Sequence, residues 1–387
     1  MHKGVGVLSA IQSLAGAYIY DYRPLEAIRT RVTPRFRVAE KRLATLLNDP
    51  FTRQDEAKAS EFITIAVILS MQDIVLTERR RKNPHTPRWL ECFLCCEQFL
   101  EAIDDGSRFW KPSIVSMSSL RISQTVIVGC GIILAQLMSP LPDPKEFNFQ
   151  KEASRFGWLL YGTKDNMHQV HGGCGFSRKV LHILSQITFC AARLEQHKES
   201  PVMPITADCL HKKLLGIRQW SPKTEDWTET MGWESAKASP PVISWVREQS
   251  EGYIICENPI MTDVTAEAWR IAAILYLMCR LLRLPRNHEE VVSHVDDLAR
   301  CIMIMPTSGP QFTAEAPLFP VFLLGILATN SGHRAVSRNW FDQVVQTPSV
   351  PPLYKTLKNI WSWIDDEIPL QAQADLVTEP SIHLRSQ

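Results

Sequence analysis

The stretch that decides the fold runs from Thr265 to Leu284 and reads Thr-Ala-Glu-Ala-Trp-Arg-Ile-Ala-Ala-Ile-Leu-Tyr-Leu-Met-Cys-Arg-Leu-Leu-Arg-Leu. From Ile271 to Cys279 the only polar side-chain group is a tyrosine hydroxyl. The segment is long, lacks the alternation of a strand and is closed by Pro285, so it predicts a helix that is apolar on nearly all sides. Such a helix must be covered by others, and the uninterrupted apolar run is too short to cross a bilayer. We therefore expect it to be the core helix of a large all-α domain.

The start of this helix carries its own signals. Thr262 or Asp263 is expected to cap it, because both side chains can accept a hydrogen bond from a free backbone N–H. Glu267 is expected in the first turn, where the helix dipole favours an anion.

Apolar periodicity predicts helices along most of the remaining chain. The expected helices cover residues 4–20, 34–48, 55–76, 89–103, 122–138, 176–197, 207–219, 287–302, 316–329, 336–344 and 353–364. Pro34 is expected to open the second of them, since proline suits the first turn of a helix. No strand with period two and no tandem repeat stands out. The sequence thus predicts an all-α fold of ten to fourteen helices.

The domain organisation predicted from these patterns is one large helical domain over residues 1–370. Inside it, residues 221–262 lack a sustained period and are expected to form a long irregular connection. Residues 371–387 are polar and are expected to form a C-terminal tail.

Composition narrows the class of protein. The chain has 387 residues, 45% of them hydrophobic and 21% charged, with a net charge of +1. It is therefore globular, and no overall field draws it to nucleic acid or to a membrane. Its ten cysteines are scattered, most of them in apolar helical patterns, which predicts reduced thiols in an intracellular protein. The apolar N-terminus resembles a signal peptide only faintly, because Gln12 and Ser13 interrupt it.

Catalytic signatures are absent from the sequence. It has no phosphate-binding loop, dinucleotide fingerprint, nucleophile elbow or His-Glu-x-x-His motif. His168, His171 and Cys174 lie three residues apart and suggest either a metal site or Cys-His pair, or a turn shaped by the neighbouring glycines. The turn is favoured, because no second ligand pair has a suitable spacing. We predict no catalytic residue, no cofactor and no metal.

Two further patterns resemble metal sites but do not meet their requirements. Three aspartate pairs could hold magnesium for diphosphate chemistry, but none continues into a third carboxylate on the same helix face; they lie at Asp104-Asp105, Asp296-Asp297 and Asp365-Asp366. Cys92 and Cys95 have a zinc-like spacing, yet the next cysteine beyond Cys96 is Cys130, so they cannot build a zinc cluster.

The densest basic run is Arg79-Arg80-Arg81-Lys82, which precedes Asn83-Pro84. It is a candidate nuclear-import signal. The alternative interpretation is a solvated loop between two helices.

Several stretches together carry a family resemblance. They are Trp89–Ile103, the turn His171-Gly-Gly-Cys-Gly-Phe-Ser177, the central helix with Leu284-Pro285, Met305-Pro306, Leu318-Phe-Pro-Val-Phe-Leu-Leu-Gly325 with Ala328, and Trp340-Phe341. Their order and spacing over roughly residues 5–345 resemble the regulatory domain of fungal-specific transcription factors of the binuclear zinc cluster type.

The resemblance implies a transcription regulator, or the regulatory-domain fragment of one, that controls gene expression through protein contacts. A secondary-metabolite pathway is one setting it suggests. It implies a nuclear location, other transcription proteins or a second copy of the chain as partners, and no membrane. The family places its zinc cluster ahead of residue 1, so DNA is expected to be reached only through a zinc cluster absent from this chain or through a partner. The alternative hypothesis is a helical enzyme or ligand-binding protein of fungal secondary metabolism.

Overall fold

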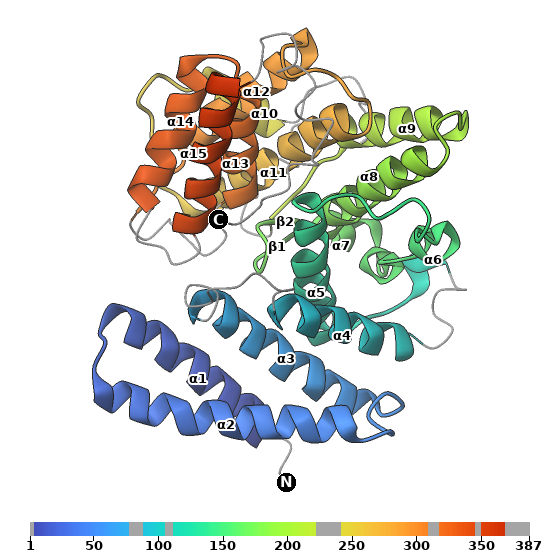
Figure 1. The fold of residues 1–387 in the computed structure, drawn as a ribbon, viewed down its shortest axis with the longest axis vertical. Helices are drawn as coiled ribbons and strands as arrows, with labels where there is room; N and C mark the ends of the chain where they lie inside the picture. The colour runs from blue at the N-terminus through green and yellow to red at the C-terminus, as the bar shows by residue number, and fades with distance from the viewer. Residues whose placement is uncertain are drawn as a thin grey trace. The chain divides into compact units, whose positions relative to one another are not determined.

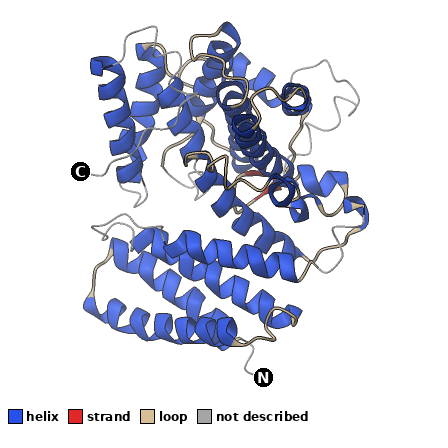
Figure 2. Ribbon diagram, turned by 45° about the vertical axis from the view of Figure 1, so that its right-hand side comes forward, coloured by secondary structure: helices blue, strands red, loops and turns tan. Residues whose placement is uncertain are grey.

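The computed structural model describes residues 4–76, 88–104, 111–221, 241–308, 317–344 and 350–367. It divides into two compact units, the first formed by residues 1–135 with 386–387 and the second by residues 136–385. The described residues form fifteen α-helices, two short 3-10 helices and one two-stranded hairpin. Figure 2 shows how little of the fold is strand. The all-α prediction is confirmed, with one helix more than the upper expectation.

The first unit is a helical bundle. Its elements are α1 (Val5–Tyr22), α2 (Glu26–Asn48), α3 (Glu56–Leu76), α4 (Arg88–Ala102), the 3-10 helix Pro112–Ile114 and α5 (Ser119–Leu137), whose last two residues belong to the second unit. Helices α1, α2 and α3 contact one another, and α3 also contacts α4; Figure 1 shows α1 and α2 side by side. A Cβ on Gly16 of α1 would lie 2.4 Å from Cγ2 of Val32 in α2. The missing side chain therefore allows the two helices to pack closely.

The expectation that Pro34 opens a helix is wrong, because Pro34 lies inside α2. A proline in a helix interior removes one backbone hydrogen bond and costs about 3 kcal/mol on helix-propensity scales. Contacts with α1 flank the proline on both sides: Val32 packs at Gly16, and the side chain of Arg42 packs at Gly6. Tertiary packing before and after Pro34 thus keeps the helix continuous.

Helix α5 is long and apolar enough to cross a membrane by length and composition alone. Within the first unit, however, its Gln124 side chain is buried and donates hydrogen bonds to the Ser60 carbonyl (2.9 Å) and to the Thr64 hydroxyl (3.0 Å) of α3. A Cβ on Gly131 would meet the Phe93 ring of α4 at 2.8 Å. These contacts are those of a core helix packed against protein neighbours.

The second unit surrounds one central helix. Its elements are α6 (Phe149–Ala153), the 3-10 helix Gly157–Leu160, α7 (Lys164–His168), β1 (Val170–His171), β2 (Phe176–Ser177), α8 (Arg178–Gln196), α9 (Val202–Gly216), α10 (Pro241–Glu248), α11 (Asn258–Arg280), α12 (Glu289–Ile304), α13 (Leu318–Leu327), α14 (Ser331–Val344) and α15 (Val350–Glu367). Helix α11 contacts α8, α9, α10, α12 and α13 as well as both strands. Figure 1 shows α13, α14 and α15 packed side by side.

The central helix predicted from the sequence is α11. Every residue from Asp263 to Arg280 is buried, as expected for a helix that is apolar on nearly all sides. Its start differs from the prediction, because α11 begins at Asn258, next to Pro259, and no side chain caps it. The expectation of a cap at Thr262 is wrong, since the Thr262 hydroxyl donates instead to the Asn258 carbonyl one turn back (3.0 Å). The described part of residues 221–262 thus contains α10 and the first turn of α11.

The hairpin is the other departure from the expected pattern. Val170 pairs with Ser177 and His171 with Phe176 in antiparallel register. Two-residue strands are too short for a period of two to be detected in a sequence. Gly175, in the connecting turn, has a φ of 78°, a conformation that favours glycine.

Candidate functional site

The charges of the central helix form a buried ion pair. Arg270 donates from Nε to Oε2 of Glu267 (2.8 Å) and from Nη2 to Oε1 (2.6 Å), and both side chains are 5% exposed. Nη1 of Arg270 donates to the Leu214 carbonyl at 2.9 Å. Burial opposes the charge on Arg270, but the attraction and hydrogen bonds of Glu267 outweigh it and raise the pKa of Arg270 above its ordinary value. The expectation that Glu267 lies in the first turn is wrong, because the helix begins nine residues earlier.

Aromatic side chains connect the central helix to its neighbours. The Trp269 ring stacks on Phe176 of β2 (centroids 4.4 Å apart) and on Phe319 of α13 (5.7 Å). Tyr276 belongs to the same helix, and its hydroxyl lies 3.2 Å from the Thr188 hydroxyl of α8. Helix α11 therefore joins the hairpin, α8 and α13 into one core, and it serves as a structural element.

The residues around the predicted turn do not converge on a ligand. Nδ1 of His171 accepts a hydrogen bond from the Gly173 N–H (3.0 Å), and Sγ of Cys174 donates to the Phe176 carbonyl (3.2 Å). His168 ends α7, where burial, with the nearby charge of Lys179, lowers its pKa to about 4. Within the described ranges no group of three His, Cys, Asp or Glu side chains could hold a metal ion. The turn therefore orders the hairpin.

Two residues that sequence reasoning did not single out tie the hairpin to the core. Gln219 accepts from the Ser177 N–H (2.7 Å) and donates to the Ala266 carbonyl in α11 (2.6 Å). Nε1 of Trp220 donates to the Asp165 carbonyl at 3.0 Å. These residues lie three and four residues after the end of α9. Nothing in the local sequence pattern indicates their contacts with segments 40 or more residues away.

The aspartate pairs are used in ion pairs. Two hydrogen bonds join Arg247 to Asp297 (2.9 and 2.6 Å). Two others join Arg334 to Asp365 (2.7 and 2.8 Å). Nε2 of His333 lies 2.6 Å from Oδ1 of Asp296. Residue 105 lies outside the described residues. Asp296, Asp297 and Asp365 are therefore engaged with basic side chains on other helices, and Asp366 accepts a hydrogen bond from the Ser362 hydroxyl of its own helix (2.9 Å).

All ten cysteines carry free thiols. On α4, burial raises the pKa of Cys92, Cys95 and Cys96, and for Cys96 it does so strongly. Metal ligation and nucleophilic attack both need the thiolate. Raised pKa values therefore favour packing as the role of these three thiols.

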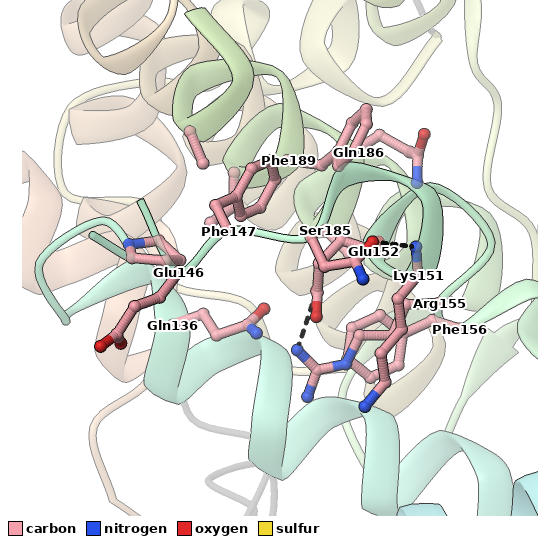
Figure 3. Close-up of a pocket in the computed structure, with 14 residues that line it drawn as sticks. Gln136, Glu146, Phe147, Lys151, Glu152, Arg155, Phe156, Ser185, Gln186 and Phe189 are labelled. Carbon is pink, nitrogen blue, oxygen red and sulfur yellow. Dashed lines mark hydrogen bonds and ion pairs between the residues drawn. The ribbon is translucent and has the colours of Figure 1, made fainter. Parts of the chain in front are cut away.

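A pocket of about 340 Å³ lies in the second unit between the end of α5, the segment around α6 and one face of α8. Figure 3 shows the aromatic rings of Phe147, Phe156 and Phe189 among its lining residues. Phe147 and Phe189 pack with centroids 5.9 Å apart. The size lies at the lower end of the range of small-molecule sites. The three rings share the lining with nine polar or charged side chains.

One wall of the pocket contains an unusual backbone conformation. Phe156 has a φ of 63°, in the left-handed region that bulky residues rarely adopt. The Arg155 guanidinium lies over the Phe156 ring at 4.7 Å and forms an ion pair with Glu152 at 3.0 Å. Strained residues of this kind cluster at functional sites, which marks the pocket as a candidate ligand site.

An exposed apolar face lies on α1. Five of its side chains are between 43% and 53% exposed: Val5, Leu8, Ile11, Tyr18 and Ile19. No charged residue occurs from Val5 to Tyr20. We call these five side chains the α1 face. Contiguous exposed apolar patches of this kind mark interaction surfaces.

The candidate nuclear-import residues Arg79, Arg80, Arg81 and Lys82 lie outside the described residues. Their role stays a prediction.

Among known proteins, the chain is similar to one family. A family model described as fungal-specific transcription factor domain matches residues 1–374. No curated protein and no experimentally determined structure is significantly similar to the chain.

Proposed function

Because the chain belongs to the family of fungal-specific transcription factor domains, we propose that it is a regulatory domain that controls gene expression in the nucleus through protein contacts. The family match over residues 1–374 carries this proposal. Such domains are not usually enzymes, and the side chains that could have suggested catalysis are engaged in ion pairs and hairpin contacts.

The proposed contact is between two copies of the chain through the α1 face. Val5, Leu8, Gln12, Ala15 and Ile19 follow alternating steps of three and four residues, which is the spacing of a and d positions in a heptad. In this register the a positions would be Val5, Gln12 and Ile19, of which two are β-branched and one is polar. Leu8 would occupy a d position. That combination favours two-stranded pairing, and a single polar a position sets its register. An uncharged face also suits a second copy of itself.

Self-association tests this contact. In light scattering coupled to size exclusion, the parent chain should have the mass of a dimer, and the double substitution Leu8→Glu and Ile11→Glu should have the mass of a monomer. Leu47→Glu is a matched control, because Leu47 is 50% exposed on α2, outside the α1 face. A parent that is monomeric at tens of micromolar would refute the second copy as the partner.

The regulatory role has its own test. The chain, fused to an unrelated DNA-binding module in a fungal reporter strain, should change transcription from the matching promoter. No change in either direction would contradict the role.

Nuclear entry is proposed to depend on the basic cluster. Substituting Arg79, Arg80, Arg81 and Lys82 by Ala in a fluorescently tagged chain should move it from the nucleus to the cytoplasm. A folded variant that stays as nuclear as the parent would show that the cluster is not the import signal.

The pocket favours a second candidate function, the binding of a small-molecule effector. Its three phenylalanine rings and its polar and charged side chains suit a ligand that has both an aromatic ring and polar substituents, such as a secondary metabolite. Ala192 lines the pocket on α8, so Ala192→Trp should block it and remove any thermal shift that such compounds cause in the parent. A shift retained in this variant would place the ligand elsewhere.

A further inference from the structure

Helix α2, together with Arg23 three residues before its start, carries an excess of positive charge. Between residues 23 and 42 the chain has seven basic and two acidic side chains, whereas the whole chain has a net charge of only +1. The basic residues are Arg23, Arg29, Arg31, Arg35, Arg37, Lys41 and Arg42. Because they alternate with other residues, they do not form the dense run that reveals a basic cluster in a sequence.

The acids near α2 are already engaged. Glu26 lies 3.6 Å from Arg29, and Glu40 pairs with Arg88 of α4 at 3.0 Å. The Arg42 guanidinium pairs with Glu61 of α3 at 2.6 Å. These ion pairs therefore neutralise Arg29 and Arg42 but none of the other basic side chains of α2.

Four cations of the helix remain without an acidic partner among the described residues: Arg31, Arg35, Arg37 and Lys41. All four are exposed. The core side of α2 is formed by buried Ala39 and Leu46, so these cations do not serve packing.

Helix geometry arranges them in two rows. Arg31 and Arg35 are four residues apart and lie one turn from each other along one row, and Arg37 and Lys41 do the same along a second. From the first to the last the rise is ten residues, about 15 Å. We call these four side chains the cationic face of α2.

We propose that the cationic face of α2 binds the phosphate backbone of duplex DNA without reading its sequence. A duplex carries one negative charge per about 1.7 Å of its axis, so four cations in two rows that together span about 15 Å of the helix meet several phosphates at once. Three of the four cations are arginines, whose planar guanidinium groups match phosphate oxygens with two parallel hydrogen bonds.

The choice of DNA among polyanions rests on the proposed function, since a transcription regulator works beside DNA. The proposed contact is with phosphates, because the backbone of every duplex presents its negative charge to an exposed row of cations whatever the sequence. Phosphate contacts of this kind position a protein on DNA without reading bases. Its role is to hold the regulatory domain against DNA that another protein or domain has selected.

The test uses the purified full chain and a fluorescein-labelled 20-base-pair duplex, with anisotropy measured from 50 to 200 mM salt. Four phosphate contacts predict that affinity falls by roughly 100-fold over this range. The quadruple variant Arg31→Gln, Arg35→Gln, Arg37→Gln and Lys41→Gln should lose at least tenfold in affinity at 50 mM salt. The slope of log affinity against log salt concentration should become shallower by about 3.6, which is the contribution of four phosphate contacts.

A second quadruple variant is the matched control, because it removes the same charge elsewhere. It replaces four exposed lysines of the second unit by Gln: Lys145, Lys164, Lys198 and Lys355. It should keep the parental slope and an affinity within about threefold of the parent, since screened charges far from the contact contribute little. Circular dichroism of both variants should match the parent, because substitutions of exposed side chains away from the core leave the fold intact.

Three results would overturn the proposal: no binding of the duplex by the parent at 50 mM salt, equal losses in the two variants, or tighter binding of phosphatidylserine vesicles or poly-glutamate than of DNA. The third would assign the face to a membrane or an acidic protein. Because this assay needs no cell and no reporter, its outcome is separate from that of the reporter fusion. A regulator that works in the reporter but binds no duplex would lose only this proposal.

Discussion

Removal of one partner from the Glu267–Arg270 pair should destabilise the protein more than most single substitutions. Both groups are 5% exposed, so the remaining charge cannot recover its interactions with water. Glu267→Ala removes two hydrogen bonds to a charged guanidinium, each contributing about 1.5–3 kcal/mol. Measured losses on breaking a buried pair are about 3–5 kcal/mol. Against a typical total stability of about 5–15 kcal/mol, we expect a loss of this size in Glu267→Ala.

The assay is urea unfolding of the purified chain, followed by circular dichroism and tryptophan fluorescence. The double variant Glu267→Met and Arg270→Met is the sharper comparison, because replacing both charges by apolar groups of similar size is often neutral. It should unfold within about 1 kcal/mol of the parent, since only the Leu214 carbonyl loses its donor.

A surface pair on the same unit gives the control. Lys212 and Asp208 of α9 lie 2.7 Å apart but are 73% and 56% exposed. Asp208→Ala should leave the urea midpoint nearly unchanged, because exposed ion pairs contribute little. If Glu267→Ala unfolded at the same urea concentration as the parent, α11 would have to be solvated at this point, and the arrangement of the second unit around it would be wrong.

Three further outcomes follow from the packing and charge of the second unit. Leu277→Asp should unfold it, because this side chain is fully buried in α11 and an unpaired charge there costs several kcal/mol; an unchanged melting temperature would show that α11 is a docking element. Gly325→Ala should lower stability by about 1–3 kcal/mol in denaturant titrations, since its Cβ would lie 2.7 Å from Leu357 of α15, whereas Gly216→Ala, with open space around it, should not. Burial and two nearby lysines lower the pKa of His182 to about 3, so the neutral ring stabilises the folded state; this contribution is complete above the unfolded pKa of 6.5 and is lost as pH falls towards 3. His182→Phe should therefore flatten the pH dependence of the unfolding free energy between pH 6.5 and 3. An unaltered slope would show that His182 does not have a lowered pKa in the folded protein.

Much of the fold could be predicted because it depends on local pattern. The run from Ile271 to Cys279 has no side that water could solvate, so a buried helix was required wherever its neighbours lay. Apolar residues at helical spacing likewise predicted the segments that became α3, α4 and α12, and all three are helices. The family resemblance rests on the order of such segments, and the match over residues 1–374 confirms it.

The candidate sites were less accessible to sequence reasoning, because they depend on which segments meet. The pocket combines the end of α5, the α6 region and α8, and its strained Phe156 carries no local signal. The cationic face of α2 was hidden in the same way, because a basic side chain becomes a free charge only when the structure shows which of its neighbours are paired.

By itself, then, the sequence determined that this chain is an all-α protein built around one apolar helix, since hydrophobic periodicity is a property of consecutive residues. Only the tertiary structure decided the rest. Glu267 became half of a buried ion pair because α11 begins at Asn258, and Pro34 remained inside α2 because α1 packs on either side of it. Both outcomes come from contacts between residues far apart in the chain, whose energies exceed local preferences for caps and helix ends.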